Sequence, residues 1–244
     1  MNFTRFKKYL VPGNYIRYVR LRCGPKYKRS YSQNGEDRLL WFIFRALGIS
    51  KPSYIDIGAH DPFSYSNTAL LYENGSTGIN IEPDPRLFKR FLKKRKRDVN
   101  LNIGVAEAGG TLDFYVMSGP ALSTFSKTEA ERLVREYGFT ITQTLPIEVK
   151  TVAEVIRDYA GGVFPDLLSI DIEGLDETIL RSMDFTASRP KVICVETISY
   201  SPTRDGIKNR ALIKFLESKG YLLLADTYIN SLFVDASVWN SPTQ

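Results

Sequence analysis

The sequence predicts an α/β fold in which seven strands form a doubly wound, mainly parallel sheet. Two observations support this prediction. Short apolar runs alternate with amphipathic segments along most of the chain, and the last two runs follow each other closely enough to form a hairpin. The chain has 244 residues, of which 43% are hydrophobic and 25% charged, so it can bury a substantial core. This composition excludes collagen-like, disordered and low-complexity proteins.

Two successive strand–helix units predict the first half of the sheet. Residues 53–58, SYIDIG, form an apolar run that ends in an acid and a glycine, as buried parallel strands do at a functional edge. Residues 66–75 have the polar cap, apolar stripe and final glycine of a helix. A strand over 77–82, a helix over 84–95 and a strand over 98–105 follow. Such units wind right-handedly into a parallel sheet.

The middle of the chain, residues 106–150, departs from this alternation. Residues 106–116 contain a Gly-Gly turn that is followed by an alternating strand. A loop, a helix over 127–138 and another β-rich stretch come next. We therefore expect an excursion between two strand–helix units.

The second half of the sheet is predicted from the remaining runs. They are a helix over 151–160, a strand within 166–174, a helix over 175–183, a strand over 190–196, a helix over 207–219 and strands over 221–226 and 231–236. Because the final hairpin reverses direction, one strand at the edge should be antiparallel.

Charge divides the chain into a basic N-terminal arm, residues 1–30, and a domain over residues 31–244. Residues 1–29 carry nine basic side chains and no acid, and the remainder has 24 basic and 27 acidic residues. Aromatic and aliphatic residues alternate with these cations, which is typical of segments that bind an anionic membrane surface. Packing on the domain, an oligomer contact and binding to nucleic-acid phosphates are the alternatives. A second basic cluster, residues 86–98, is predicted to be a solvated helix face.

Localisation is predicted from what the sequence lacks. No stretch approaches the roughly 18 consecutive apolar residues of a membrane span, and residues 1–29 have no secretory signal pattern. We expect a cytoplasmic protein, peripheral at the inner face of the membrane if the arm binds lipid. Cys23 and Cys194 should be reduced thiols. His60 is the only histidine, which excludes zinc sites built on several histidines.

Residues at the ends of the first two strands predict a nucleoside site. In open α/β sheets ligands bind beyond the carboxyl ends of the strands. The first strand ends with Asp56, Gly58 and Ala59, and the glycine permits close approach of the backbone to a ligand. Glu82 ends the second strand 26 residues after Asp56, the spacing of an acid that binds a ribose diol.

Missing motifs narrow the choice of nucleoside. The chain has no G-x-G-x-x-G, and Pro62 removes a backbone donor where a pyrophosphate would need one. It also has no G-x-x-x-x-G-K-[ST] and no tyrosine followed four residues later by lysine. These absences disfavour NAD and nucleoside triphosphates, and S-adenosylmethionine is the adenosine cofactor without phosphates.

Six blocks of the chain together resemble one known family, the FkbM-type methyltransferases. The resemblance extends from about Tyr31 to Trp239. The blocks are YSQNGEDRLL (31–40), YIDIGAHDPFSYSNTALLYENGSTGINIEPDP (54–85), NIGVAEAGGTLDFY (102–115), STF (123–125), LLSIDIEGLDETIL (167–180) and PKVICVET (190–197).

The resemblance implies a Rossmann-like, doubly wound seven-stranded methyltransferase sheet and S-adenosylmethionine-dependent O-methylation. The acceptor in this family is often a sugar of a bacterial glycan, which places the activity in polysaccharide biosynthesis. By resemblance Asp56, Gly58 and Glu82 match cofactor-binding positions, and Asn102 is placed toward the adenine. Many relatives have a second glycine after the first strand where this chain has residues 60–62, His-Asp-Pro, so the contacts to the methionine part do not carry over simply.

Acids at two neighbouring strand ends are the candidates for catalysis. Asp171, Glu173 and Asp176 follow the fourth strand, and Glu196 ends the fifth. Methylation of an alcohol needs the hydroxyl proton removed, either by a base or by a metal that lowers the hydroxyl pKa. Asp171, Glu173 and Glu196 could hold Mg²⁺ or Mn²⁺ through oxygen ligands.

Two other interpretations of these residues stay open. In one, Asp171 holds the methionine amino group or the substrate, Glu173 and Asp176 cap the next helix, and Glu196 binds a substrate hydroxyl. In the other, His60 is the general base.

Two other classes of protein are alternatives to a sugar O-methyltransferase. A nucleic-acid methyltransferase would explain the basic clusters, but the amino-group methylases carry [DN]-P-P-[YF] after strand four, where this chain has DIEG at 171–174. A non-catalytic module that binds a glycan or a protein partner would not need the full set of strand-end acids. The acceptor sugar and its hydroxyl are not specified by the sequence.

Overall fold

The computed structural model describes residues 30–203 and 205–241. Nearly all of the basic arm predicted over residues 1–30, together with its predicted membrane contact, lies outside the described residues. Within the described part, no helix is both long and apolar enough to cross a membrane.

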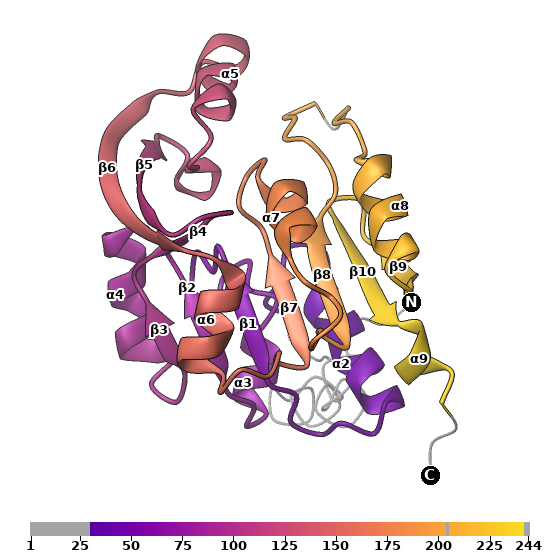
Figure 1. The fold of residues 1–244 in the computed structure, drawn as a ribbon. Helices are drawn as coiled ribbons and strands as arrows, with labels where there is room; N and C mark the ends of the chain where they lie inside the picture. The colour runs from indigo at the N-terminus through magenta and orange to yellow at the C-terminus, as the bar shows by residue number, and fades with distance from the viewer. Residues whose placement is uncertain (1–29, 204, 242–244) are drawn as a thin grey trace, which may run out of the picture. The chain divides into compact units, whose positions relative to one another are not determined.

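A seven-stranded sheet forms the centre of the domain (Figure 1). Its order is β3 (Val99–Leu101), β2 (Gly78–Ile81), β1 (Tyr54–Ile57), β7 (Leu167–Ile170), β8 (Val192–Glu196), β10 (Asn230–Asp235) and β9 (Tyr221–Asp226). The five strands from β3 to β8 are parallel, and β10 is antiparallel to both of its neighbours. The predicted fold class is confirmed. The antiparallel strand is β10, which lies next to the edge strand β9.

Helices cover both faces of this sheet. Apolar side chains of α6 (Val152–Tyr159), α7 (Asp176–Ser182) and α8 (Arg210–Ser218) pack on one face. Those of α2 (Glu36–Ala46) and α3 (Ala69–Glu73) pack on the other. α2 is an element that the sequence patterns did not indicate, and the chain ends its described part with α9 (Ala236–Trp239).

Local sequence explains where these helices start. Asp84 caps α4 (Pro85–Lys94) by accepting from the N–H of Arg86, and a proline occupies the first helical position. α6 begins with a capping box in which Thr151 and Glu154 satisfy each other's backbone N–H groups.

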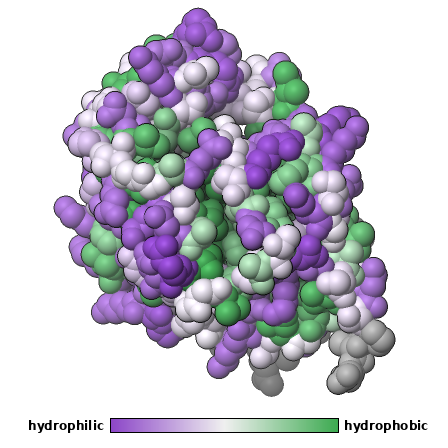
Figure 2. Space-filling model, viewed as in Figure 1, coloured by the Kyte–Doolittle hydropathy of each residue, from purple (hydrophilic) through white to green (hydrophobic). Residues whose placement is uncertain are grey.

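The predicted excursion is a separate three-stranded sheet, ordered β4 (Gly104–Val105), β6 (Ile141–Lys150) and β5 (Gly110–Met117). The short helices η3 (Pro120–Leu122) and α5 (Lys127–Tyr137) lie between β5 and β6. The excursion projects beyond the end of the main sheet where the loop after β8 also lies (Figure 1), and the outer surface of α5 is largely hydrophilic (Figure 2). The strand predicted over 98–105 is therefore divided, with β3 in one sheet and β4 in the other.

Arg95 corrects the prediction that residues 86–98 form only a solvated face. Its side chain is completely buried, and it donates to Asp98, to the Tyr54 hydroxyl and to Thr68, each at 2.9 Å. The Thr68 hydroxyl in turn donates to Asp56 at 2.7 Å. The guanidinium of Arg95 can be buried because these partners, most of them distant in sequence, satisfy its donors. Through Thr68 the network also connects Arg95 to Asp56 at the end of β1.

Replacement of Arg95 with methionine should lower the free energy of unfolding by about 3–5 kcal/mol, because it leaves the buried Asp98 carboxylate without its cationic partner. Chemical denaturation measures this change. Lys93→Met, at an exposed position in the last turn of α4, is the matched control and should change stability by less than about 0.5 kcal/mol. Equal effects of the two substitutions would show that the Arg95 network does not stabilise the fold.

Candidate active site

One face of the sheet changes from apolar to polar at the carboxyl ends of its strands. On the face that packs on α2 and α3, Tyr54, Leu167 and Val192 belong to the core. Because side chains alternate along a strand, Asp56 and Ser169, two residues further on, point to the same face and lie opposite each other in the register.

The next level on this face contains the candidate catalytic groups. Gly58, Asp171 and Glu196 directly follow three residues that are paired across neighbouring strands, Ile57, Ile170 and Val195. Asn230 of β10 pairs with Glu196. Side by side at this level lie Gly58, Asp171, Glu196 and Asn230. All four line a cavity of about 900 Å³.

The end of β1 is shaped for close packing. Gly58 has φ +78°, and a Cβ at this position would lie 1.9 Å from the carbonyl oxygen of Asp171, so no other residue fits without moving the backbone. Asp56 is buried, and burial raises the pKa of its carboxyl although the Thr68 hydroxyl donates to it. Ala59 lines the cavity, and its N–H donates to the carbonyl of Ile81.

Glu82 follows β2 with both carboxylate oxygens held by the backbone. One accepts from the N–H of His60 at 2.7 Å and the other from the N–H of Asp84 at 2.8 Å. Burial raises the pKa of Glu82 to about 8 despite these hydrogen bonds. Glu82 lines a smaller cavity of about 40 Å³ that shares Gly58 and His60 with the larger one.

Asn102 lines neither of these two cavities. Its side-chain amide donates to the carbonyl oxygens of Glu82 and Pro83, each at 2.9 Å, and so holds the segment after β2. Its placement toward the adenine stays a prediction.

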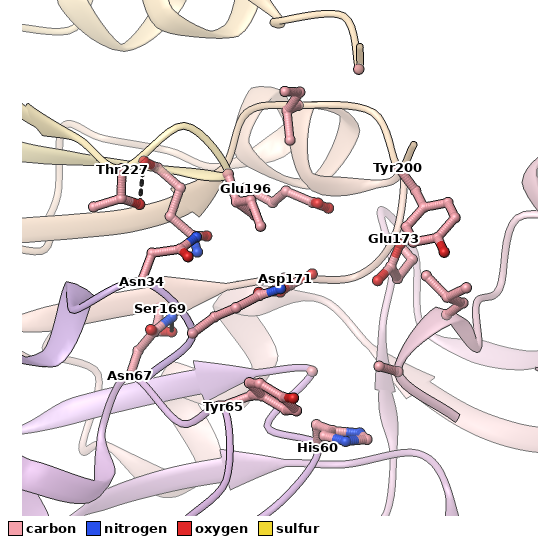
Figure 3. A pocket seen from close by; sticks show the side chains of 18 of the residues that line it. Asn34, His60, Tyr65, Asn67, Ser169, Asp171, Glu173, Glu196, Tyr200 and Thr227 are labelled. Carbon is pink, nitrogen blue, oxygen red and sulfur yellow. Dashed lines mark hydrogen bonds between the residues drawn. The ribbon is translucent and has the colours of Figure 1, made fainter. Parts of the chain in front are cut away.

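The structure brings Asp171, Glu173 and Glu196 together. Each offers a carboxylate oxygen, and these oxygens lie within 4.8 Å of one another. Figure 3 shows Asp171 between Glu196 on one side and Tyr65 and His60 on the other. We call these three carboxylates the acid cluster.

Burial and mutual repulsion favour the protonated forms of the acid cluster. They raise the pKa of Asp171 to about 7 and the pKa values of Glu173 and Glu196 well above the usual range. Asp176, at the start of α7, accepts from the N–H of Ile172 at 3.2 Å, and burial raises its pKa to about 6. A cation bound at the cluster would offset this repulsion.

Stability should therefore depend on pH in a defined direction. Carboxyls whose pKa is raised by folding stabilise the protein below their unfolded pKa, and this contribution is lost as the pH rises through the folded value. With a chelator present, the melting temperature should fall between pH 5.5 and 8, and Glu196→Gln should raise it at pH 8 by about 2–4 °C or more. Glu107→Gln, at an exposed position, should leave it unchanged. Equal stability of wild type and Glu196→Gln at pH 8 would contradict the proposed repulsion.

His60 lines both cavities and has an unusual backbone conformation, with φ +52°. Burial lowers the pKa of its imidazole, which favours the neutral form that a general base requires. The adjacent Asp61 accepts from the N–H groups of Phe63 and Ser64 and pairs with Arg90 at 2.8 Å. The His-Asp-Pro segment is thus a structured turn at the cavity wall.

The excursion contributes to the site through the STF block. The Thr124 hydroxyl donates to the carbonyl of Glu173 at 3.0 Å, and Glu173 has φ +51°. Thr124 is buried, so it fixes the backbone that carries one member of the acid cluster. The sequence block 123–125 was the only signal of this role.

Several cavity residues were not predicted from the sequence as site residues. Tyr200, in the loop after β8, packs against Tyr137 and Phe139 with ring centroids 5.6 and 5.9 Å apart, which joins this loop to the excursion. Asn67 donates to Ser169 at 3.4 Å (Figure 3). Asn34 and Asn230 come from the opposite ends of the described chain.

A family model described as the methyltransferase FkbM domain matches residues 56–223, which include β2, β3, β7, β8 and the acid cluster. The chain belongs to the FkbM methyltransferase family. The predicted recognition is confirmed, and the matched residues include Gly58, Glu82 and the acid cluster. None of the curated proteins compared with the chain matches it.

Solved structures resemble the FkbM domain only distantly. A putative caffeoyl-CoA O-methyltransferase from Staphylococcus aureus is 10% identical, with coverage of 94% of this chain and 98% of that one and a TM-score of 0.47. An O-methyltransferase from Bacillus cereus, in complex with SAH, is 10% identical, with 95% and 96% coverage and a TM-score of 0.41. A TehB-like SAM-dependent methyltransferase from Corynebacterium glutamicum is 10% identical, with 92% and 99% coverage and a TM-score of 0.42. The family assignment does not depend on these likenesses.

Proposed function

We propose that this protein is an S-adenosylmethionine-dependent O-methyltransferase that methylates a hydroxyl of a sugar in a bacterial glycan or its precursor. The observation that carries the proposal is the juxtaposition of two groups at the end of the sheet. The Gly58 turn with the backbone-held Glu82 offers a nucleoside site, and the acid cluster lies beside it, at the ends of the next two strands, β7 and β8.

The residues present fit the cofactor. Each carboxylate oxygen of Glu82 accepts one backbone N–H and has a second lone pair for a ribose hydroxyl. Gly58 lets the backbone approach the cofactor, and Asp56, buried beneath it, fixes the end of β1. Asp171, at the end of β7, would accept from the methionine amino group. The positive charge of the sulfonium would favour the ionised form of a carboxyl in the acid cluster.

The acid cluster is also placed to take the proton that the acceptor hydroxyl loses. Its oxygen ligands and their spacing suit a hard divalent cation such as Mg²⁺ or Mn²⁺, held by Asp171, Glu173 and Glu196. Such an ion would lower the pKa of a bound hydroxyl. Without it, Asp171 or His60 accepts the proton directly.

A transfer assay tests the proposed function. The full chain is incubated with methyl-labelled S-adenosylmethionine and a panel of neutral sugars, amino sugars and lipid-linked or nucleotide-linked sugars, and label in the sugar is measured. We expect label on a hydroxyl of at least one neutral or amino sugar. Label on nucleic acid in a parallel reaction that contains RNA and DNA, or bound cofactor with no transfer to any sugar, would contradict the proposal. Absence of cofactor binding as well would favour a non-catalytic binding module.

A further inference from the structure

Positive charge is concentrated in one segment of the domain, residues 86–98. This segment contains eight of the 24 basic residues of the domain and one of its 27 acids, so the rest of the domain has 16 basic and 26 acidic residues. α4 forms most of the segment and lies at the outer edge of the domain, on the side of β2 and β3 (Figure 1). The domain therefore has one strongly basic surface on an otherwise acidic body, which orients it toward an anionic partner.

The arginines of this segment already have partners within the domain. Three of the four form ion pairs with aspartates: Arg86 with Asp84, Arg90 with Asp61 and Arg95 with Asp98. The fourth, Arg97, lies over the ring of Tyr72, 3.9 Å from its centre, and donates to the carbonyl of the same residue. The positive charge that is left for an external partner therefore belongs to the lysines.

The four lysines of the segment have no such partners. All of them are exposed, and we call them the lysine patch: Lys89, Lys93, Lys94 and Lys96. They form no ion pair within residues 30–203 and 205–241. Neither of the cavities described above has a lysine of the patch in its lining, so the patch suits a broad anionic surface better than a small ligand.

Exposed apolar side chains lie next to the lysine patch. Leu92 is 52% exposed and follows Lys89 by three residues, so the two side chains are neighbours on the surface of α4. Val99, which is 40% exposed, begins β3 just after the patch. Lysines beside exposed apolar side chains are typical of surfaces that bind membranes, because anionic headgroups attract the ammonium groups and the apolar side chains enter the headgroup layer.

The same observations disfavour a nucleic acid as the partner. Arginine binds phosphates in a bidentate manner and is the preferred cation for such contacts, but the arginines of this segment are engaged by the domain itself. A phosphate backbone would also leave Leu92 and Val99 without an apolar environment.

We propose that α4 docks on a membrane surface that contains anionic lipids, with the lysine patch on the lipid phosphates and Leu92 in the headgroup layer. An anionic surface repels the acidic remainder of the domain, so only this side can approach it. Each lysine contributes little by itself, and docking should therefore be reversible and weakened by salt. It is independent of the methyl transfer proposed above.

Cosedimentation of the full chain with vesicles tests this proposal. One vesicle preparation contains phosphatidylcholine alone, and the other contains phosphatidylcholine mixed with phosphatidylglycerol. The patch variant carries three substitutions: Lys89→Gln, Lys93→Gln and Lys94→Gln. The matched control removes the same charge at exposed positions on or beside α5 and α8: Lys127→Gln, Lys214→Gln and Lys219→Gln.

We expect the wild type and the matched control to bind the anionic vesicles and not the neutral ones, and the patch variant to bind the anionic vesicles about tenfold more weakly or less. The basic arm is present in all three proteins, so a difference between the two triple variants belongs to the patch. Thermal melting establishes that both variants are folded.

The proposal is overturned if the two triple variants bind the anionic vesicles equally, or if the wild type does not bind them. A parallel titration with duplex DNA and RNA covers the alternative partner. Tighter binding of the wild type to a duplex than to the vesicles, lost in the patch variant, would assign the patch to nucleic acid and would also overturn the proposal.

Discussion

Replacement of Asp171 with asparagine should lower the rate of methyl transfer by about 10²–10⁴-fold, the usual contribution of a positioned acid or base. The asparagine keeps the size of the side chain and an oxygen that can accept from the methionine amino group, so cofactor affinity should change far less than turnover. The measurement is kcat with a saturating acceptor, together with calorimetric titration of S-adenosylmethionine.

Further measurements distinguish the ways in which the proton can leave. If Asp171, Glu173 and Glu196 hold a metal, a chelator should stop transfer and Mg²⁺ or Mn²⁺ should restore it. If chelation has no effect and His60→Ala removes turnover but spares cofactor binding, His60 is the base. Full activity of Asp171→Asn would show that the acid cluster takes no part in the reaction.

Replacement of Glu82 with alanine should weaken S-adenosylmethionine binding at least tenfold, since hydrogen bonds to a charged group contribute about 1.5–3 kcal/mol. Wild-type affinity should also rise between pH 6 and 9, because the ionised form of a carboxyl with a pKa of about 8 accepts both ribose hydroxyls. Binding should therefore release a proton at neutral pH.

Calorimetry in two buffers of different ionisation enthalpy measures the released proton. Glu82→Gln should abolish the dependence on pH, and Glu148→Ala, at an exposed position on β6, should behave as wild type. Wild-type affinity in Glu82→Ala would show that the ribose does not bind there.

The strand-end residues were predictable because short parallel strands deliver their last residues to one edge. The spacing from Asp171 to Glu196 covers one helix and one strand, so the sequence placed both acids on neighbouring strands, and the structure brings them within 4.8 Å. Glu82 is at the end of β2 for the same reason. Roles in binding and catalysis need a ligand, and those assignments stay predictions.

The features that sequence patterns missed depend on contacts between distant segments. Arg95 has the helical spacing of a solvated cation, but Tyr54 and Thr68 bury it. The side-chain amide of Asn230 donates to Glu36, which is 194 residues away in the sequence.

The division of the third predicted strand has a local cause. β3 pairs with β2 and β4 pairs with β6, so the chain changes sheets between Leu101 and Gly104. Asn102, inside this crossover, satisfies two carbonyls of the neighbouring segment. A run of apolar residues does not reveal such a change, because both parts have the alternation of a strand.

We expect the end of this sheet to bind an adenosine cofactor without a pyrophosphate. Calorimetric titration of the full chain with S-adenosylmethionine, and in parallel with NAD, tests it most directly. We expect saturable binding of one S-adenosylmethionine per chain and no binding of NAD, because the β1 turn has a single glycine and Pro62 offers no amide donor. Binding of NAD without binding of S-adenosylmethionine would contradict it.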